Sequence, residues 1–246
     1  MMHPQAPSPH MAAPSLPAVV GRVRAVLTGR ARPTTRPGSV SAIDKQPRAG
    51  AVRAGPEGLD GDEQGDRRVH GGPDKAVHVY PFAHLAFWRR ELPQAAQRLQ
   101  AEGAFGENLA IDGPTEAEVC LADRWRIGGA RFEVSQGRQP CWKLDDRFGV
   151  DGMARLVQAS GRTGWYLRVL DPGLVAAGDA IVLEARPHPG WPLARLMRAI
   201  DRGERDPATL RAILELPLPA SWRRLFEQRL ASGRVESWVR RLTGRD

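Results

Sequence analysis

Cysteine is the residue type in this chain best suited to nucleophilic or soft-metal chemistry, and its two occurrences have different surroundings. Cys141 lies in a polar segment that follows a predicted strand and also carries Arg138 and Lys143. These cations would favour the thiolate, the form that acts as a nucleophile or binds a soft metal. Cys120 lies in an alternating apolar run, which is typical of a buried small hydrophobic residue. Cys141 is therefore the candidate reactive residue.

A glycine-rich segment at 58–77 is the second candidate, because its residue types build neither a continuous strand nor a helix. Its glycines permit positive φ and close backbone approach, so that N–H groups can face an anion, and His70, Asp74 and Lys75 lie beside the turn. The phosphate-loop pattern of nucleotide-binding proteins does not occur. An ordinary charged turn before the next strand is the competing interpretation, and composition alone favours it.

A shorter glycine-flanked segment, 103–109, places Phe105, Glu107 and Asn108 at a predicted helix-to-strand junction. By itself this pattern is weak. Two chemistries remain open for the three segments together. Cys141 with His70 as base would suit a hydrolase or acyl transferase. Alternatively, a lone thiolate suits a metal that brings its other ligands within a cofactor, as molybdenum or tungsten does in a pterin dithiolene.

Short strands must position these segments. The period-two patterns, separated by Gly, Pro and Asp turn signals, predict a barrel or a sandwich. We expect strands at 19–27, 40–43, 51–54, 76–80, 118–121, 124–127, 131–135, 165–170 and 180–185. Helices are expected at 83–92, 94–102 and 152–159, so the fold class is mainly β with helical insertions (α+β).

Beyond residues 187–189 the pattern becomes helical only, which predicts a domain boundary. Three or four amphipathic helices follow, with Asp206 as one N-cap before Pro207 and Ser221 as another. We therefore expect a disordered proline-rich leader at 1–18, a β domain at 19–186 and a small helical bundle at 187–246.

Composition narrows the class of protein. The 246 residues contain 41% hydrophobic residues and carry a formal net charge of +8. No run approaches the ~18 apolar residues of a membrane span. Two cysteines supply neither a disulfide framework nor a four-thiolate cluster, which favours a reducing, cytoplasmic location and an external source of electrons. The positive excess lies mostly after Arg186, and nucleic-acid binding is ranked last because solvated arginine-rich helix faces explain it.

Four motifs in register resemble one known family. The stretches GDEQGDRRVHGGPDKAVHVY (61–80), FGENL (105–109), QPCWKL (139–144) and TGWYLRVLDPG (163–173) resemble the MOSC domain, the molybdenum cofactor sulfurase C-terminal domain. With the helical tail, the chain is most similar to the YiiM-like 6-N-hydroxylaminopurine resistance proteins. The resemblance implies a β-barrel-like MOSC domain, followed by a three-helix domain, that binds the molybdenum cofactor.

The resemblance also implies residue roles. Cys141 would be the protein ligand to molybdenum and the catalytic residue. The cofactor pocket would be lined by Asp62, His70, Gly71, Gly72, Asp74, Lys75, Phe105, Gly106, Glu107, Asn108, Arg138, Gln139 and Lys143. Two of the chain's three lysines, Lys75 and Lys143, fall in these loops, although the chain otherwise uses arginine for its positive charge.

The implied activity is reduction of N-hydroxylated compounds, such as hydroxylaminopurine base analogues, to amines in detoxification. An external reductase would supply the electrons, and homodimerisation is left open. Pyridoxal phosphate binding is attached to the family by association only. A molybdenum cofactor carrier or sulfur-transfer protein, which would need Cys141 without reducing a substrate, is the alternative.

Overall fold

The barrel is formed by strands from both halves of the chain. The computed structural model describes residues 16–65 and 71–244. Its main sheet has the order β13-β9-β10-β11-β7-β8-β1-β4, and β13 also pairs with β1, which closes the sheet on itself. The strands are β1 (Ala18–Thr28), β4 (Gln46–Pro47), β7 (Val77–Pro81), β8 (Leu109–Asp112), β9 (Arg124–Ile127), β10 (Ala130–Gly137), β11 (Trp165–Asp171) and β13 (Ala180–Ala185). The pair β7–β8 is parallel.

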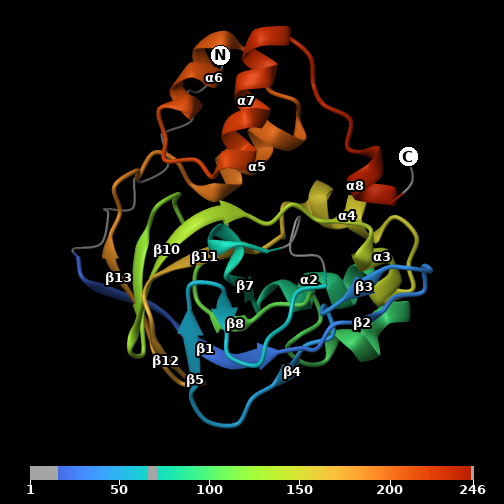
Figure 1. The fold of residues 1–246 in the computed structure, drawn as a ribbon, viewed down its shortest axis with the longest axis vertical. Helices are drawn as coiled ribbons and strands as arrows, with labels where there is room; N and C mark the ends of the chain where they lie inside the picture. Colours follow the sequence, from blue (N-terminus) through green and yellow to red (C-terminus); the bar gives the residue numbers. More distant parts are fainter. Residues whose placement is uncertain (1–15, 66–70, 245–246) are drawn as a thin grey trace, which may run out of the picture.

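Two smaller sheets extend from the barrel. β5 (Val52–Gly55) pairs with β6 (Gly58–Leu59) and with β12 (Gly173–Val175). β2 (Arg32–Pro33) pairs with β3 (Val40–Ser41) in a hairpin that reaches away from the barrel toward α3 and α8 (Figure 1). This β2–β3 hairpin supplies one wall of the pocket described below.

Short helices lie on the same side of the barrel as the hairpin (Figure 1). They are η1 (Pro73–Lys75), α2 (His84–Glu91), η2 (Pro93–Leu99), α3 (Lys143–Phe148) and α4 (Met153–Ser160). Tyr80, Trp88, Phe105 and Phe148 pack between them in a separate aromatic core, with the rings of Tyr80 and Phe105 stacked at 4.4 Å. This core fixes the backbone that leads into and out of the pocket.

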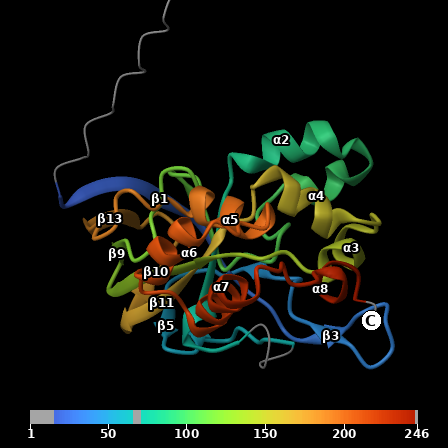
Figure 2. The same ribbon diagram turned by 90° about the horizontal axis from the view of Figure 1, so that it is seen from above.

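The C-terminal helices α5 (Leu193–Asp201), α6 (Pro207–Leu214) and α7 (Ala220–Ser232) cover one end of the barrel, and α8 (Val239–Thr243) lies apart from them near α3 (Figure 2). Leu196 and Trp222 belong to the same buried cluster as Val134 of β10 and Trp165 of β11. At Gly137 a Cβ would lie 2.5 Å from the sulfur of Met197, so α5 packs directly on β10. The helices and the barrel therefore share a hydrophobic core.

Most predicted strands are confirmed to within about a residue, but three expectations are wrong. The run 118–121 is not a strand: Glu118 and Val119 donate to the carbonyl of Thr115 and end a turn, and Cys120 forms an isolated bridge with Pro192. The predicted helix at 94–102 is the 3-10 helix η2, and the predicted strand at 40–43 shortens to β3. In each case, hydrogen bonds within local turns form in place of the regular hydrogen bonding of the predicted strand or helix.

Two predicted caps have different outcomes. Asp206 caps α6 as expected, and its carboxylate accepts the N–H of Thr209 at 2.8 Å. Ser221 lies inside α7, because the N-cap residue is Pro219 and the helix begins one residue before Ser221. The predicted leader 1–18 lies outside the described residues except for its last three.

Within residues 16–65 and 71–244, none of the helices combines the length and the apolar character that a bilayer crossing requires.

Candidate functional site

A pocket of about 590 Å³ opens where the loop after β10, the β2–β3 hairpin and the acidic loop after β6 meet. It brings together segments that are far apart in the sequence. Of the residues predicted from the sequence, the pocket is lined by Asp62, Lys75, Phe105, Gly106, Asn108, Arg138, Cys141 and Lys143.

Cys141 is half-buried in the loop between β10 and α3 and faces this pocket. Lys75, the last residue of η1, lies close to it. Burial lowers the pKa of Lys75, and the negative charges of Cys141 and Asp74 oppose that shift. Cys141 therefore has a partly buried ammonium group as a neighbour in the pocket.

The other cysteine differs in both burial and ionisation. Cys120 is 3% exposed, and its sulfur lies 3.6 Å from the carbonyl oxygen of Pro189. Burial raises the pKa of the Cys120 thiol to about 11, with the charge of Asp123 adding to the effect. Cys120 is thus a protonated, enclosed thiol at neutral pH, as the sequence predicts for a small buried residue.

His78 and Tyr166 form one wall of the pocket from the paired strands β7 and β11. Their rings lie 5.1 Å apart between centroids. Burial, with the positive charge of Arg138, holds the pKa of His78 well below its usual range. The imidazole is therefore neutral at pH 7, and its protonation is not required for folding.

Two buried polar atoms at this wall have no hydrogen-bond partner among the described residues. They are Nε2 of His78 and Nη1 of Arg138, and their side chains are 4% and 6% exposed. Leaving such a group unsatisfied costs about 1–3 kcal/mol. Both residues line the pocket, and the guanidinium of Arg138 favours an anion there.

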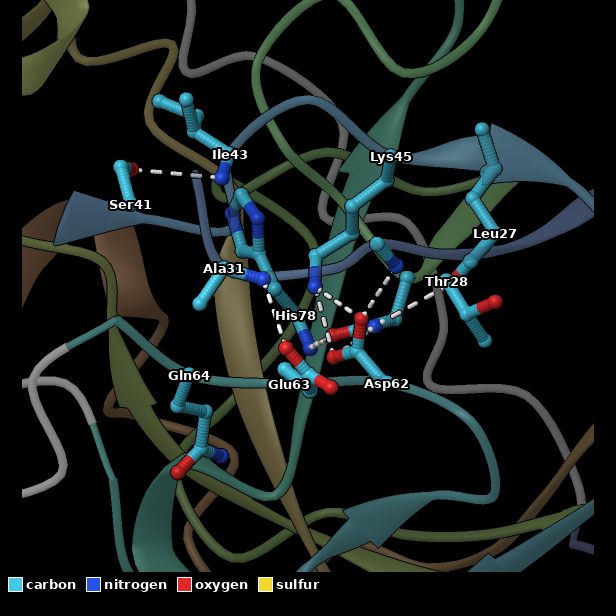
Figure 3. A network of polar contacts seen from close by, with 12 residues as sticks. Leu27, Thr28, Ala31, Ser41, Ile43, Lys45, Asp62, Glu63, Gln64 and His78 are labelled. Carbon is cyan, nitrogen blue, oxygen red and sulfur yellow. Dashed lines mark hydrogen bonds and ion pairs between the residues drawn. The ribbon is translucent and has the colours of Figure 1, made fainter. Parts of the chain in front are cut away.

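Asp62 anchors the acidic loop on the opposite side of the pocket. Its carboxylate pairs with the ammonium of Lys45 at 2.5 Å and accepts the N–H of Gly29 at 2.8 Å and the amide of Asn108 at 2.9 Å. Figure 3 shows Lys45 and Asp62 pointing toward one another. Because its oxygens are used in this network, Asp62 supports the pocket wall through neighbouring residues.

Glu63 fixes the same loop to the chain after β1. Its carboxylate accepts the N–H of Ala31 at 2.8 Å (Figure 3) and the guanidinium of Arg30 at 2.7 Å. The acidic residues of the glycine-rich segment thus act as tethers between loops.

The segment around Gly106 holds the hairpin and the wall in register. Gly106 has φ +75°, and a Cβ there would lie 2.6 Å from Cγ1 of Ile43, so a larger residue would displace the hairpin. Asn108 accepts the backbone N–H of His78 at 3.0 Å and donates to the carbonyl of Leu27 at 3.2 Å. These contacts set the width of the pocket.

Several predicted residues do not line the pocket. Asp74 forms an ion pair with Arg168 at 2.8 Å, and Glu107 is a buried carboxylate that accepts the N–H groups of Gly103 and Phe105 at 2.6 and 3.0 Å. Burial raises the pKa of Glu107, and these backbone bonds oppose the shift. Further predicted residues absent from the lining are Gly71, Gly72 and Gln139. His70 lies outside the described residues.

Other lining residues were not predicted, notably Lys45, His78, Tyr166 and the hairpin residues 41–43. His78 and Tyr166 lie in strands, where alternation predicts only which face of the sheet a residue occupies. The sequence did contain a signal by which Lys45 could have been predicted as a pocket residue. It is the third lysine of the chain, and all three lysines line this one pocket.

The donor set fits the cofactor expected from the resemblance. Among residues 16–65 and 71–244 there is no group of three or more His, Cys, Asp or Glu side chains able to hold a metal ion. A cofactor that brings most of the metal's ligands within an organic group needs only one protein thiolate, and Cys141 can supply it. Lys75, Arg138 and Lys143 place positive charge in the pocket of Cys141, while the charge of Lys45 is paired with Asp62, and this arrangement suits an anionic, phosphate-bearing cofactor.

Comparison with family models and known proteins agrees with this architecture. A model of the MOSC domain matches residues 66–182, and a model of the YiiM-like, 3-alpha helix domain matches residues 191–233. The crystal structure of YiiM from Escherichia coli superposes with a TM-score of 0.74 at 32% identity, covering 90% of this chain and 98% of that one.

Two relatives are informative in sequence. Protein YiiM of Escherichia coli (strain K12) is 38% identical over 208 residues, which are 85% of this chain and 92% of that protein. A protein named reductase from Gibberella moniliformis is 35% identical over 218 residues, or 88% of this chain but 38% of that protein. The greater part of the fungal protein therefore has no counterpart here.

Proposed function

Since this chain belongs to the MOSC-domain family, in the branch that carries the YiiM-like three-helix domain, we propose that it binds the molybdenum cofactor and reduces N-hydroxylated compounds to amines. The observation that carries the proposal is the half-buried Cys141, facing a cationic pocket that contains the unpartnered Nη1 of Arg138. A cytoplasmic location, with neither Cys120 nor Cys141 in a disulfide, is part of the proposal.

In the proposed reaction, an N–OH group takes up two electrons and two protons. The N–O bond breaks, the amine is released and the oxygen leaves as water. When bound, the molybdenum cofactor supplies the two-electron redox chemistry that cleaves the N–O bond. The electrons come from a separate reductase, which is consistent with a relative named reductase in which the matching part is a minor fraction of the chain.

In this proposal, the chain's own residues bind and orient the cofactor. Cys141 would hold the metal as its single protein thiolate, and the neighbouring ammonium of Lys75 would favour that thiolate. Arg138 would bind an anionic group of the cofactor through Nη1. The neutral imidazole of His78 would line the pocket beside the cofactor.

Lys143 has a different proposed part. Its ammonium donates to the carbonyl of Val40 at 2.7 Å, and this bond ties the start of α3 to the β2–β3 hairpin. Lys143 would therefore shape the pocket as well as contribute positive charge. Asp62 and Asn108 would maintain the opposite wall through the contacts described above.

The two cysteines provide a matched test. Wild type, Cys141→Ser and Cys120→Ser are to be produced in a host that makes molybdopterin, and molybdenum is to be measured by elemental analysis. We expect wild type and Cys120→Ser to carry molybdenum and Cys141→Ser to lose it. Wild-type protein without molybdenum would overturn the proposal.

Activity separates the enzyme from the carrier alternative. With a chemical reductant and a hydroxylaminopurine, wild type and Cys120→Ser should release the aminopurine, and Cys141→Ser should not. Molybdenum content without turnover would instead support a cofactor carrier or sulfur-transfer protein, for which Cys141 is also needed.

A further inference from the structure

A second cleft lies between helices α2, α4 and α5, and it shares no lining residue with the pocket at Cys141. Its free space, including the part open to solvent, is about 1590 Å³. Neither the family resemblance nor the proposed reaction uses this cleft.

Four arginines from three segments line the cleft: Arg155 of α4, Arg162 of the following loop, and Arg198 and Arg202 at the end of α5. Arg198 and Arg202 are four residues apart, so their like charges lie on the same side of the helix and repel each other. In the part of the chain that the structure describes, the side chains of Arg155, Arg198 and Arg202 form no ion pair and no hydrogen bond. These three charges thus remain available to a ligand.

Arg162 is held in place at the opposite side of the cleft. Its guanidinium lies 3.9 Å above the ring of Phe87, and its Nη1 donates to the carbonyl of Ser160 at 3.3 Å. The ring of Phe87 covers one face of the guanidinium group and leaves the other face uncovered by that ring. A preorganised guanidinium loses little conformational entropy when it binds an anion.

The acidic residues of the cleft do not cancel this charge. Glu116 pairs with His84 at 2.8 Å and also accepts the N–H of Gly164 at 2.6 Å, with both side chains largely buried. Asp201 has an Oδ1 atom with no described partner, and burial raises the pKa of its carboxyl to about 7. At neutral pH the cleft therefore carries a net positive charge.

Apolar side chains complete the lining, including Phe87, Met197 and Leu242. Positive groups at the rim beside an apolar wall match a ligand with an anionic head and an organic body. We propose that this cleft is a second binding site, which takes a small organic molecule bearing a phosphate group. The arginines would bind the phosphate, and the apolar wall would bind the organic part.

Isothermal titration with phenyl phosphate and with inorganic phosphate tests the proposal. We expect both to bind wild type, phenyl phosphate more tightly, with affinities that fall as salt is added. The double variant Arg198→Gln/Arg202→Gln should bind phenyl phosphate about tenfold more weakly, because two solvent-screened, charge-assisted contacts to the phosphate are lost. Unchanged affinity in this variant, or no binding by wild type, would overturn the proposal.

Three further variants keep the result specific. Arg224→Gln removes an exposed arginine of α7 outside the cleft and should bind as wild type does. Asp201→Asn removes a carboxylate from the cleft and should tighten binding at pH 8, which a general loss of folding cannot imitate. Lys75→Gln alters only the pocket at Cys141 and should leave this binding intact, whereas a loss there would assign the phosphate to that pocket and reject the second site.

Discussion

Arg241 of the last helix donates from Nη1 to the carbonyl of Pro140, the residue before Cys141, at 2.6 Å. Its own carbonyl accepts the N–H of Trp142, the residue after Cys141, at 2.9 Å. One residue of α8 therefore holds the loop of Cys141 on both sides. Its second nitrogen, Nη2, donates to Gln158 of α4 at 2.8 Å, so the loop is also tied to the helical layer.

Replacing Arg241 should loosen this loop. In Arg241→Ala the Pro140 carbonyl and Gln158 lose their donor, and we expect the free energy of unfolding to fall by about 1–3 kcal/mol. The thiol of Cys141 should react several-fold faster with a disulfide reagent in metal-free protein. Arg234→Ala, at an exposed residue, is the control and should leave both quantities unchanged. Equal thiol reactivity in the two variants would show that Arg241 does not hold the loop of Cys141.

Breaking the buried pair of Lys45 and Asp62 should be costly. Their side chains are 8% and 6% exposed, and burial already lowers the pKa of Lys45 against the opposing charge of Asp62. Asp62→Asn leaves a buried ammonium without its partner charge, so we expect a loss of about 3 kcal/mol in urea unfolding. The exposed Asp60→Asn should lose less than about 0.5 kcal/mol. Similar losses for both variants would contradict the role of the pair.

Position 164 requires glycine for two reasons, its positive φ angle and the close approach of neighbouring atoms. It has φ +70°, and a Cβ would lie 2.3 Å from the carbonyl of Val79 and 2.9 Å from Nε2 of His78. Its carbonyl accepts the N–H of Arg138 at 3.0 Å, so displacement of this residue would move a pocket side chain.

The matched comparison is with Gly161, which has φ +67° but no atom within 4 Å of a built Cβ. Gly161→Ala should cost about 1 kcal/mol from backbone strain alone. Gly164→Ala should cost at least about 2 kcal/mol more because of the steric overlap. Thermal unfolding of both variants measures the difference. Equal melting temperatures would mean that the residues around Gly164 shift to accommodate the added methyl group without a loss of stability.

Asp201 should make stability depend on pH. Burial raises its pKa from 3.8 to about 7, opposed by Arg241 and Arg229, so the folded state binds this proton more tightly than the unfolded state. The resulting stabilisation is fully present below pH 3.8 and is lost as pH rises through about 7.

Asp201→Asn should therefore show a flatter profile than wild type between pH 4 and pH 8, where both are measured by urea unfolding. With allowance for solvent screening, the difference across this window is on the order of 1 kcal/mol. The exposed Asp151→Asn should retain the wild-type slope. A wild-type slope in Asp201→Asn would show that another group carries the dependence.

Local sequence patterns predicted the strands and helices that have strong periodicity. They failed where a turn forms in place of a regular strand or helix. The run 118–121 alternates like a strand, yet Asp123 accepts the N–H of Cys120 at 3.0 Å and pairs with Arg186 at 2.7 Å. These contacts close a turn, and residue 186 lies too far along the chain for a local pattern to include it. The helix α3, which begins directly after the Cys141 loop, was not predicted either.

The sequence by itself determined the barrel-forming strands, the helical tail and Cys141 as the candidate reactive residue, because period-two and helical patterns and the polar surroundings of a thiol are local properties. It also carried a sign of the pocket in its three lysines, of which Lys45 could be assigned only from the structure. Tertiary structure decided which residues meet. His78 and Tyr166 face the pocket through strand register, and Arg241 reaches the Cys141 loop from about a hundred residues away, through contacts that depend on how the helices pack against the barrel.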